Sequence, residues 1–273
     1  MARILITGGT GTVGNEIVRQ YKGNLDELIV YSRNEKNQIE MMRKYPNIKY
    51  IIGDIRDYKA ILRATENVET IYHLAAIKHI AICEEQPAEA FKTNIKGTVN
   101  ILNAAKKNKC KVVFLSSDKA ENPNSIYGCT KRIGEILTLN NNQCVIRSGN
   151  IFASSGSVIP YWISQVKNTN IIELTDCRMT RWFISVQELV KEILKEKTTG
   201  LYIPDKMKSY KMIDIAEYIA KTYGNKDTQI IITGGRPGER LYEYLGGESS
   251  ENNTGNINDI KKLFNDTRTG ILA

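Results

Sequence analysis

The chain has 273 residues, of which 41% are hydrophobic and 25% are charged. These proportions are ordinary for a soluble globular protein, and no apolar run approaches the length of a membrane span. The formal net charge is +8, but the basic residues are scattered, and no RNA-binding motif or zinc finger accompanies them. The composition therefore argues against a membrane protein and against a nucleic-acid-binding protein. Anionic small molecules explain the positive charge adequately.

Cysteine and histidine usage bears on the compartment and on metal binding. The five cysteines lie far apart, without a CxxC pair, and are Cys83, Cys110, Cys129, Cys144 and Cys177. We expect reduced thiols in the cytoplasm, and neither a disulfide framework nor a zinc site. No signal peptide precedes the first strand, which fits a cytoplasmic protein. The two histidines, His73 and His79, are too few for a metal centre.

Short apolar runs alternate with helical patterns through the first 150 residues. The runs typical of strands are 3–7, 28–31, 48–52, 69–74, 111–116 and 143–149. This alternation predicts an α/β fold with a Rossmann-like, doubly wound parallel sheet. We expect a dinucleotide-binding domain over residues 1–150 that also carries the catalytic residues. Residues 151–273 are expected to form a smaller, mainly substrate-binding lobe, with a mobile tail or short arm from Glu248.

A glycine-rich turn follows the first apolar run and precedes an amphipathic helix. Glycines there permit a tight turn, close approach of a pyrophosphate and close packing of helix on strand. Such strings also occur at flavin and mononucleotide sites, but this position at the start of a βαβ unit favours a dinucleotide. The cofactor residues expected from the turn are Gly8, Thr10, Gly11, Thr12, Val13 and Gly14.

The second apolar run ends where the adenosine ribose of a dinucleotide should lie. An acidic residue there would favour a free 2′-hydroxyl, whereas this chain has Ser32, Arg33 and Lys36. Basic side chains suit a 2′-phosphate, so the sequence favours NADP over NAD. The alternative is that both charges are merely solvated at the start of a helix.

The ends of the third and fourth runs should complete the cofactor site. We expect Asp54 to reach the adenine amino group, and small residues after His73 to let the cofactor pass. The residues predicted here are Asp54, Ile55, Ala75, Ala76 and Lys78.

A long helix is predicted over residues 88–108. Its apolar residues Phe91, Ile95, Val99 and Leu102 suggest a stripe that faces the core. Asn94 on the same helix could hold a water or a backbone carbonyl in a proton relay.

A serine, a tyrosine and a lysine provide chemistry for removing a proton from a hydroxyl. Ser117 ends a predicted strand, and Tyr127 and Lys131 are four residues apart, on one face of a helix. A nearby ammonium favours the phenolate and so lowers the pKa of a tyrosine. We expect Tyr127 to act as a base while a hydride leaves the carbon, with Ser117 bound to the same oxygen.

Directly after Ser117 comes an acid/base pair, Asp118 and Lys119. Plain alcohol oxidation does not need this pair, so its place beside the catalytic serine indicates a second reaction in the same pocket. The alternative is a surface ion pair of little energetic weight.

Several segments resemble the UDP-N-acetylglucosamine 4,6-dehydratases of the polysaccharide-biosynthesis group, within the extended short-chain dehydrogenases/reductases. They are TGGTGTVG, AAIKHIAICEEQPAEAFKTN, SSDKAENPNSIYGCTK, IRSGNIFASSGSVIP, LTDCRMTRWFI and GGRPGERLYE. Members that retain the sugar configuration are membrane-attached and generally carry methionine at the tyrosine position. With Tyr127 at this position and no membrane helices, the chain resembles the soluble branch, whose members invert the configuration at C5.

The resemblance implies roles for the catalytic residues. Lys131 would hold the nicotinamide ribose and lower the pKa of Tyr127, which would take the C4 hydroxyl proton as C4 hydride passes to NADP. Lys119, as a neutral amine, would take the C5 proton, and Asp118 would protonate the leaving C6 hydroxyl. The hydride would return to C6, and C5 would be reprotonated from the opposite face, with Tyr127 a candidate donor.

The resemblance also implies a substrate, an assembly and further contacts. UDP-N-acetylglucosamine is the expected substrate, and a homo-oligomer, a dimer or higher, is the expected assembly. The expected substrate residues are Lys78, Asn150, Arg181, Arg236 and Glu239. Arg181 could instead stack on Trp182, and Arg236 could be a turn charge.

Three rival functions stay open at this point. A retaining 4,6-dehydratase or a C4 epimerase/reductase of nucleotide sugars would share the fold, although an epimerase needs no Asp-Lys pair. A non-catalytic NADP-sensing regulator is the rival of another class, but such proteins typically lose the Tyr/Lys pair.

Overall fold

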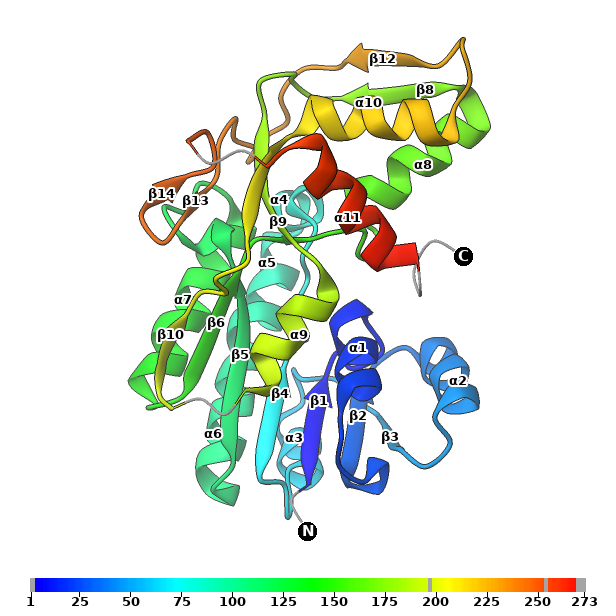
Figure 1. Ribbon diagram of the computed structural model, residues 1–273. Coiled ribbons are helices and arrows are strands. Elements are labelled where there is room, and N and C mark those ends of the chain that lie inside the picture. Colours follow the sequence, from blue (N-terminus) through cyan, green and yellow to red (C-terminus); the bar gives the residue numbers. More distant parts are fainter. Residues whose placement is uncertain (1–2, 196–197, 253–254, 269–273) are drawn as a thin grey trace. The chain divides into compact units, whose positions relative to one another are not determined.

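The computed structural model describes residues 3–195, 198–252 and 255–268 (Figure 1). It divides into two compact units. The first comprises Met1–Arg147 and Val190–Ile203, and the second comprises Ser148–Leu189 and Pro204–Ala273. The first unit thus ends close to the expected boundary at residue 150. It also takes in Val190–Ile203, which was expected in the second lobe, because the strand within that segment joins the first unit's sheet.

A seven-stranded sheet forms the centre of the first unit, in the order β10-β6-β5-β4-β1-β2-β3. β1 pairs in parallel with β2 and β4, and β10 pairs in parallel with β6. The strand bounds are β1 Ile4–Thr7, β2 Leu28–Ser32, β3 Lys49–Ile52, β4 Thr70–His73, β5 Lys111–Ser117, β6 Cys144–Ser148 and β10 Gly200–Tyr202. The predicted α/β fold with a Rossmann-like parallel sheet is confirmed.

The central strands are apolar on both faces because helices cover both sides of the sheet (Figure 1). Every residue of β1 and β2 is buried. Several helices begin at the polar cap that the sequence supplies: the side chains of Asn34, Asp57 and Ser125 each accept a bond from a backbone N–H of the first turn. The helix bounds are α1 Thr12–Gln20, α2 Glu35–Lys44, α3 Tyr58–Ala64, α4 Ile80–Glu85, α6 Gly97–Asn108 and α7 Ile126–Asn140.

The strand order reverses between β1 and β4, so their carboxyl ends flank the crevice where ligands bind in sheets of this kind. There the hydroxyl of Thr7 lies 2.8 Å from Nδ1 of His73. Nε2 of His73 lies 3.1 Å from the hydroxyl of Thr98. Burial lowers the pKa of His73 to about 3, so this imidazole is a neutral structural group.

The helix predicted over residues 88–108 is interrupted by a π-helical segment. It consists of α5 Pro87–Ala90, the π-helical segment η2 Phe91–Lys96, and α6. The predicted core stripe is wrong at Phe91, which is 54% exposed. An extra residue in the π-turn rotates the helix and turns Thr93 and Asn94 inward instead.

The second unit contains small sheets and its own apolar core. β9 pairs with β11 and β7, β8 with β12, and β13 with β14. The strand bounds are β7 Asn150–Ile151, β8 Ile171–Leu174, β9 Thr180–Ile184, β11 Lys208–Lys211, β12 Gln229–Ile232, β13 Tyr244–Leu245 and β14 Glu248–Ser249. The helices are α8 Val158–Thr169, α10 Met212–Tyr223 and α11 Ile257–Arg268, and α9 Val186–Leu194 begins in this unit.

The expectation of a mobile tail or arm from Glu248 is wrong for most of that segment. Glu248 begins β14, and α11 packs on the core of the second unit (Figure 1). Phe264 of α11 is fully buried, with its ring 4.9 Å from that of Phe152 in an edge-on arrangement. Apolar residues at helical spacing, Ile260 and Leu263 among them, hold α11 in place. Residues 253–254 and 269–273 lie outside the described part of the chain.

Candidate active site

The predicted catalytic residues come from two adjoining elements of the first unit. Ser117 is the last residue of β5, and Asp118 and Lys119 form the short turn η3 Asp118–Ala120. Tyr127 and Lys131 lie on the first two turns of α7. The switch from strand to helix between β5 and α7 thus brings all five residues to one end of the sheet.

A chain of hydrogen bonds joins three of these residues, Ser117, Asp118 and Lys119. The Ser117 hydroxyl is close enough to Tyr127 to favour its phenolate and so to lower the Tyr127 pKa. Ser117 Oγ donates to Asp118 Oδ1 over 2.8 Å, and Lys119 Nζ donates to the same oxygen over 3.0 Å. The Asp118 side chain is fully buried and that of Lys119 is 19% exposed. The alternative of a surface ion pair therefore does not describe this pair.

Lys131 points away from this chain of bonds. Its Nζ donates to the carbonyl oxygen of Leu115 over 2.6 Å and lies 4.0 Å from the centre of the Phe114 ring. Burial lowers the pKa of Lys131 to about 7, against a weaker opposing effect of Glu135. An amine with this pKa exists in both its charged and its neutral form near neutral pH.

The expected lowering of the Tyr127 pKa by Lys131 is wrong for this structure. Burial raises the pKa of Tyr127 to about 12, because a phenolate is poorly solvated there. The strongest opposing effect is the charge of Lys119, followed by the effect of the Ser117 hydroxyl. Lys119, and not Lys131, is therefore the lysine that favours the phenolate.

Three contacts fix the start of α7, and one of them is made with η3. Glu84 Oε1 accepts the backbone N–H of Ile126 over 2.7 Å, and Ser125 Oγ accepts that of Gly128 over 3.1 Å. A methyl group on Gly128 would collide with the backbone carbonyl oxygen of Lys119. Only glycine permits this close approach, so the sequence fixes the distance between α7 and the Asp118-Lys119 pair.

Asn94 supports the segment that enters the site from β4. Its side chain accepts from the backbone N–H of Ile77 over 2.8 Å and donates to the Ile77 carbonyl over 2.9 Å. It also donates to the hydroxyl of Thr130, on α7, over 3.0 Å. The sequence suggests that Asn94 holds either a water or a backbone carbonyl. In the structure it binds a backbone carbonyl, that of Ile77. Lys78 follows in this segment, and burial lowers its pKa.

The glycine-rich turn has the geometry that a dinucleotide requires. Gly8 has φ +66, and a Cβ on it would lie 2.9 Å from the Cα of Ala75, so the ends of β1 and β4 meet without side chains between them. A Cβ on Gly14 would collide with the backbone of Gly9, which only a glycine avoids. Gly11 caps α1 with no side-chain hydrogen bond. The turn therefore fits a pyrophosphate at the start of α1.

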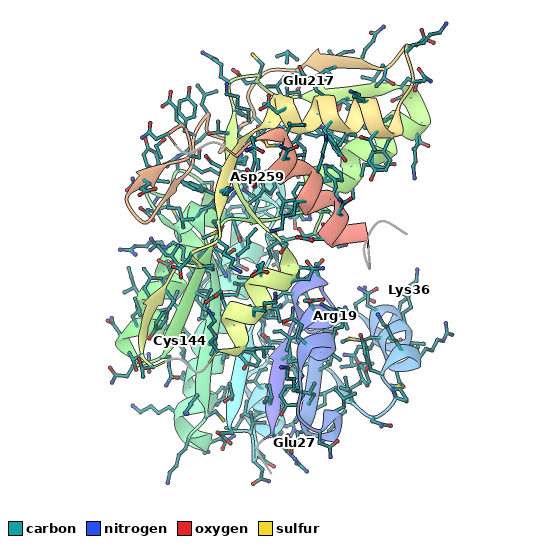
Figure 2. All side chains as sticks on the ribbon, viewed as in Figure 1. Arg19, Glu27, Lys36, Cys144, Glu217 and Asp259 are labelled. Carbon is teal, nitrogen blue, oxygen red and sulfur yellow. The ribbon has the colours of Figure 1, made fainter. Side chains whose placement is uncertain are left out.

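The residues predicted at the adenosine end form a charged group. Arg56 donates to Asp54 Oδ2 over 2.8 Å, and Nη1 of Arg33 lies 3.6 Å from the same oxygen. Gln38 donates to the hydroxyl of Ser32 over 3.0 Å. Lys36 extends from the start of α2 into solvent, with 84% of its side chain exposed (Figure 2). Arg33 is thus near the expected ribose position, whereas the Asp54 carboxylate already binds Arg56, a partner that the sequence did not suggest.

In the second unit, two predicted substrate residues, Asn150 and Arg181, both contact Glu243, which the sequence analysis did not identify. Asn150 Nδ2 donates to Glu243 Oε2 over 3.0 Å, and Arg181 Nε lies 3.3 Å from Glu243 Oε1. Arg181 also donates to the carbonyls of Thr180 and Leu241. Glu243 is buried. It is the last residue of GGRPGERLYE, one of the segments that carry the resemblance, and this was the signal that could have found it.

Arg236 and Glu239 lie outside that cluster. They belong to an exposed turn after β12, in which the Glu239 N–H donates to the Arg236 carbonyl over 3.1 Å and Gly238 has φ +79. Arg236 is close enough to Tyr161 of α8 to act on it electrostatically. Within the second unit, the predicted substrate residues therefore fall into two groups.

The described residues contain no cluster of three or more His, Cys, Asp or Glu side chains that could hold a metal ion. Nor does any helix in the described ranges combine the length and the apolar character needed to cross a membrane.

Several known proteins resemble this chain over most of its length. It is 37% identical to the inverting UDP-N-acetylglucosamine 4,6-dehydratase of Campylobacter jejuni, over 89% of this chain and 76% of that protein. It is 33% identical to a UDP-glucose 4-epimerase of Rickettsia canadensis, over 97% of this chain and 83% of that protein. A Methanocaldococcus jannaschii protein named an uncharacterized membrane protein is 38% identical, over 96% of this chain and 84% of its own length.

Two solved structures with the same architecture cover most of this chain. The crystal structure of Pen from Bacillus thuringiensis matches with a TM-score of 0.83 and 36% identity, over 89% of this chain and 82% of that chain. A dTDP-glucose 4,6-dehydratase of Streptomyces venezuelae has a TM-score of 0.81 at 20% identity, over 98% of both chains, which shows the shared fold. The family model described as "Polysaccharide biosynthesis protein" matches residues 4–264. The chain therefore belongs to the polysaccharide biosynthesis protein family.

Proposed function

We propose that this protein is a UDP-N-acetylglucosamine 4,6-dehydratase that inverts C5 and uses NADP. The observation that carries the proposal is the buried Asp118-Lys119 pair, which is hydrogen-bonded to Ser117 and close enough to Tyr127 to act on its pKa. Removing water across C5 and C6 needs a base and an acid beyond the groups that oxidise C4, and this pair provides both. The 37% identity to the inverting dehydratase of Campylobacter jejuni supports the same conclusion.

The first unit supplies the residues for the cofactor. The glycine-rich turn would hold the pyrophosphate at the start of α1, and Arg33 would pair with a 2′-phosphate. The 2′-phosphate would compete for Arg33 with the Asp54 carboxylate, 3.6 Å from Nη1. When bound, the nicotinamide accepts a hydride from C4 of the sugar and later gives it to C6.

The same residues would carry the proton transfers. Tyr127 acts as the phenolate that the positive charge of Lys119 favours. It takes the C4 hydroxyl proton and becomes the neutral phenol, while Ser117 bonds the same oxygen of the sugar. The C4 ketone then acidifies the C5 hydrogen. Transfer of the Lys119 proton to Asp118 along their 3.0 Å hydrogen bond would give the neutral amine that removes this hydrogen and the acid that the next step needs. Asp118 gives a proton to the C6 hydroxyl, which leaves as water.

The last step sets the configuration. Once hydride has reached C6, C5 accepts a proton from the face opposite to the one it left. The product would be UDP-2-acetamido-2,6-dideoxy-β-L-arabino-hex-4-ulose. Because the hydride returns, no net oxidant or reductant is consumed in a turnover.

A C4 epimerase of UDP-sugars is the second candidate, because relatives with that name are 33% identical to this chain. Such an enzyme would return the hydride to C4 and would need no acid at C6. A retaining dehydratase is separated from the proposal by the C5 configuration. A non-catalytic regulator would bind the cofactor but would convert no UDP-sugar.

Incubating the purified protein with UDP-N-acetylglucosamine and NADP tests the proposal. A 4-keto-6-deoxy sugar in the product supports a dehydratase. UDP-N-acetylgalactosamine in its place would establish the epimerase. If neither UDP-N-acetylglucosamine nor, in a parallel incubation, UDP-glucose is changed, the regulator is left.

A further inference from the structure

A second set of buried charges lies beside the proposed active site. Arg147 is the second-last residue of the strand β6. It donates through Nε and Nη2 to the two oxygens of Glu135, over 2.8 and 2.7 Å. Its Nη1 donates to Glu121 Oε2 over 2.7 Å. The exposed fractions of these side chains are 7% for Arg147, 0% for Glu135 and 16% for Glu121. None of the three has a part in the chemistry proposed above.

The two carboxylates belong to the two elements that carry the catalytic residues. Glu135 lies four residues after Lys131 and eight after Tyr127 on α7, so the three project from one side of the helix. Glu121 directly follows η3, and its N–H donates to the Asp118 carbonyl over 2.9 Å. One guanidinium therefore joins the catalytic helix to the turn that bears the acid/base pair.

The same two elements also touch at their other end. Gly128, next to Tyr127, packs against the backbone carbonyl of Lys119 so closely that a methyl group would not fit. The spacing between α7 and η3 is therefore fixed twice, by this contact and by the pairing of Arg147 with Glu135 and Glu121.

Apolar side chains would fill this space without the desolvation cost of three charges, and such replacements are often neutral or stabilising. A guanidinium adds fixed bond directions, since its planar fork can bind one carboxylate with two nitrogens and a second carboxylate with the third. We propose that Arg147 is a positioning residue that, through Glu135 and Glu121, sets the separation between Tyr127 and the Asp118-Lys119 pair. The proposal rests on the proposed function for the roles of those catalytic groups.

Glu121→Ala in the full chain removes the link from Arg147 to the segment after η3, while Arg147 keeps both bonds to Glu135. We expect kcat for formation of the keto sugar to fall by about tenfold or more, since a small misplacement of the reacting groups slows the reaction strongly. KM and the thermal unfolding midpoint should stay near the wild-type values. Glu121→Gln keeps an acceptor oxygen and should recover most of the lost kcat.

Arg132→Ala is the matched control. Arg132 contacts the same carboxylate of Glu135, over 3.1 Å, but its side chain is 46% exposed. It has no place in the link to η3, so its loss should leave kcat unchanged.

Hydrogen exchange gives a readout that needs no turnover. In Glu121→Ala the amides of Lys119 and Glu121 should exchange faster, while those of α7 stay protected. This result is expected even if UDP-N-acetylglucosamine proves to be the wrong substrate, so the two proposals can fail separately. Wild-type kcat and wild-type exchange in Glu121→Ala would overturn the positioning role. Faster exchange throughout β5 and α7, with no recovery in Glu121→Gln, would also overturn it, because that pattern means a general packing role.

Discussion

The two lysines of the candidate active site lie in contrasting surroundings. Lys119 is partly exposed and paired with the carboxylate of Asp118, whereas Lys131 is buried against the Leu115 carbonyl and the Phe114 ring. Only Lys119 opposes the rise in the pKa of Tyr127, and only Lys131 has its own pKa brought to about 7 by burial. Sequence spacing pairs Tyr127 with Lys131, but the electrostatics of the fold pairs it with Lys119.

The largest loss of activity is expected from a substitution of Tyr127, the residue whose pKa distinguishes the two lysines. Tyr127→Phe removes the acceptor of the C4 proton, so the first oxidation should slow by about 10²- to 10⁴-fold. UDP-N-acetylglucosamine should still bind, which calorimetry can check. Tyr161→Phe, on an exposed tyrosine of the second unit, is the control. Turnover of Tyr127→Phe near the wild-type rate would remove Tyr127 from the mechanism.

Lys119→Met tests whether this lysine has two roles. Product should fall by about 10²-fold or more, because the base for C5 is lost. The first oxidation should also slow near neutral pH, since the charge that favours the Tyr127 phenolate is gone.

A pH series with Lys119→Met separates those roles. The phenolate becomes more populated as pH rises towards the Tyr127 pKa, so oxidation, followed by the absorbance of reduced nicotinamide, should recover. Formation of the keto sugar should not. Recovery of both together would limit Lys119 to an electrostatic role, and a wild-type rate at all pH values would exclude it from the chemistry.

Lys131→Met tests the burial of the other lysine through protein stability. The folded chain releases the Lys131 proton near pH 7 and the unfolded chain near 10.5, so the unfolded state binds more protons between these values. Wild-type stability therefore gains from rising pH across this window, and the variant lacks that gain. The free energy of unfolding of the variant minus that of the wild type should fall from about pH 7 to about pH 10.5 in urea titrations. A pH-independent difference would mean that Lys131 is solvated.

The smallest expected effect is at the cofactor. Arg33→Ala should weaken NADP binding by about tenfold and leave NAD binding nearly unchanged, because one charge-assisted contact to the 2′-phosphate is lost. Arg43→Ala, later on α2, is the control. Wild-type protein that binds NAD as tightly as NADP would contradict the preference.

Much of the first unit could be predicted from sequence because its signals are local. Apolar runs and the glycine turn depend on neighbouring residues, and they placed the sheet and the Ser117-Tyr127 region correctly. The π-turn that exposes Phe91 could not be predicted in this way, because it accompanies the bonds of Asn94 to the distant backbone of Ile77. The direction of Lys131 was missed for a similar reason: a long side chain can reach several partners, and only the fold selects one.

Other omissions had a visible signal. Arg147 interrupts the apolar strand CVIRS, and a charge in a buried strand requires a partner. The partners, Glu135 and Glu121, are 12 and 26 residues away, so the sequence could not identify them. Helix α11 was overlooked because its polar composition hid the apolar positions of Ile260 and Phe264.

The C5 configuration of the product formed in heavy water tests the central claim most directly. NMR of the product from UDP-N-acetylglucosamine should show a 4-keto-6-deoxy sugar of L-arabino configuration, with deuterium at C5. A product that keeps the C5 configuration, or one that is altered only at C4, would contradict the assignment of Asp118 and Lys119 to an inverting dehydration.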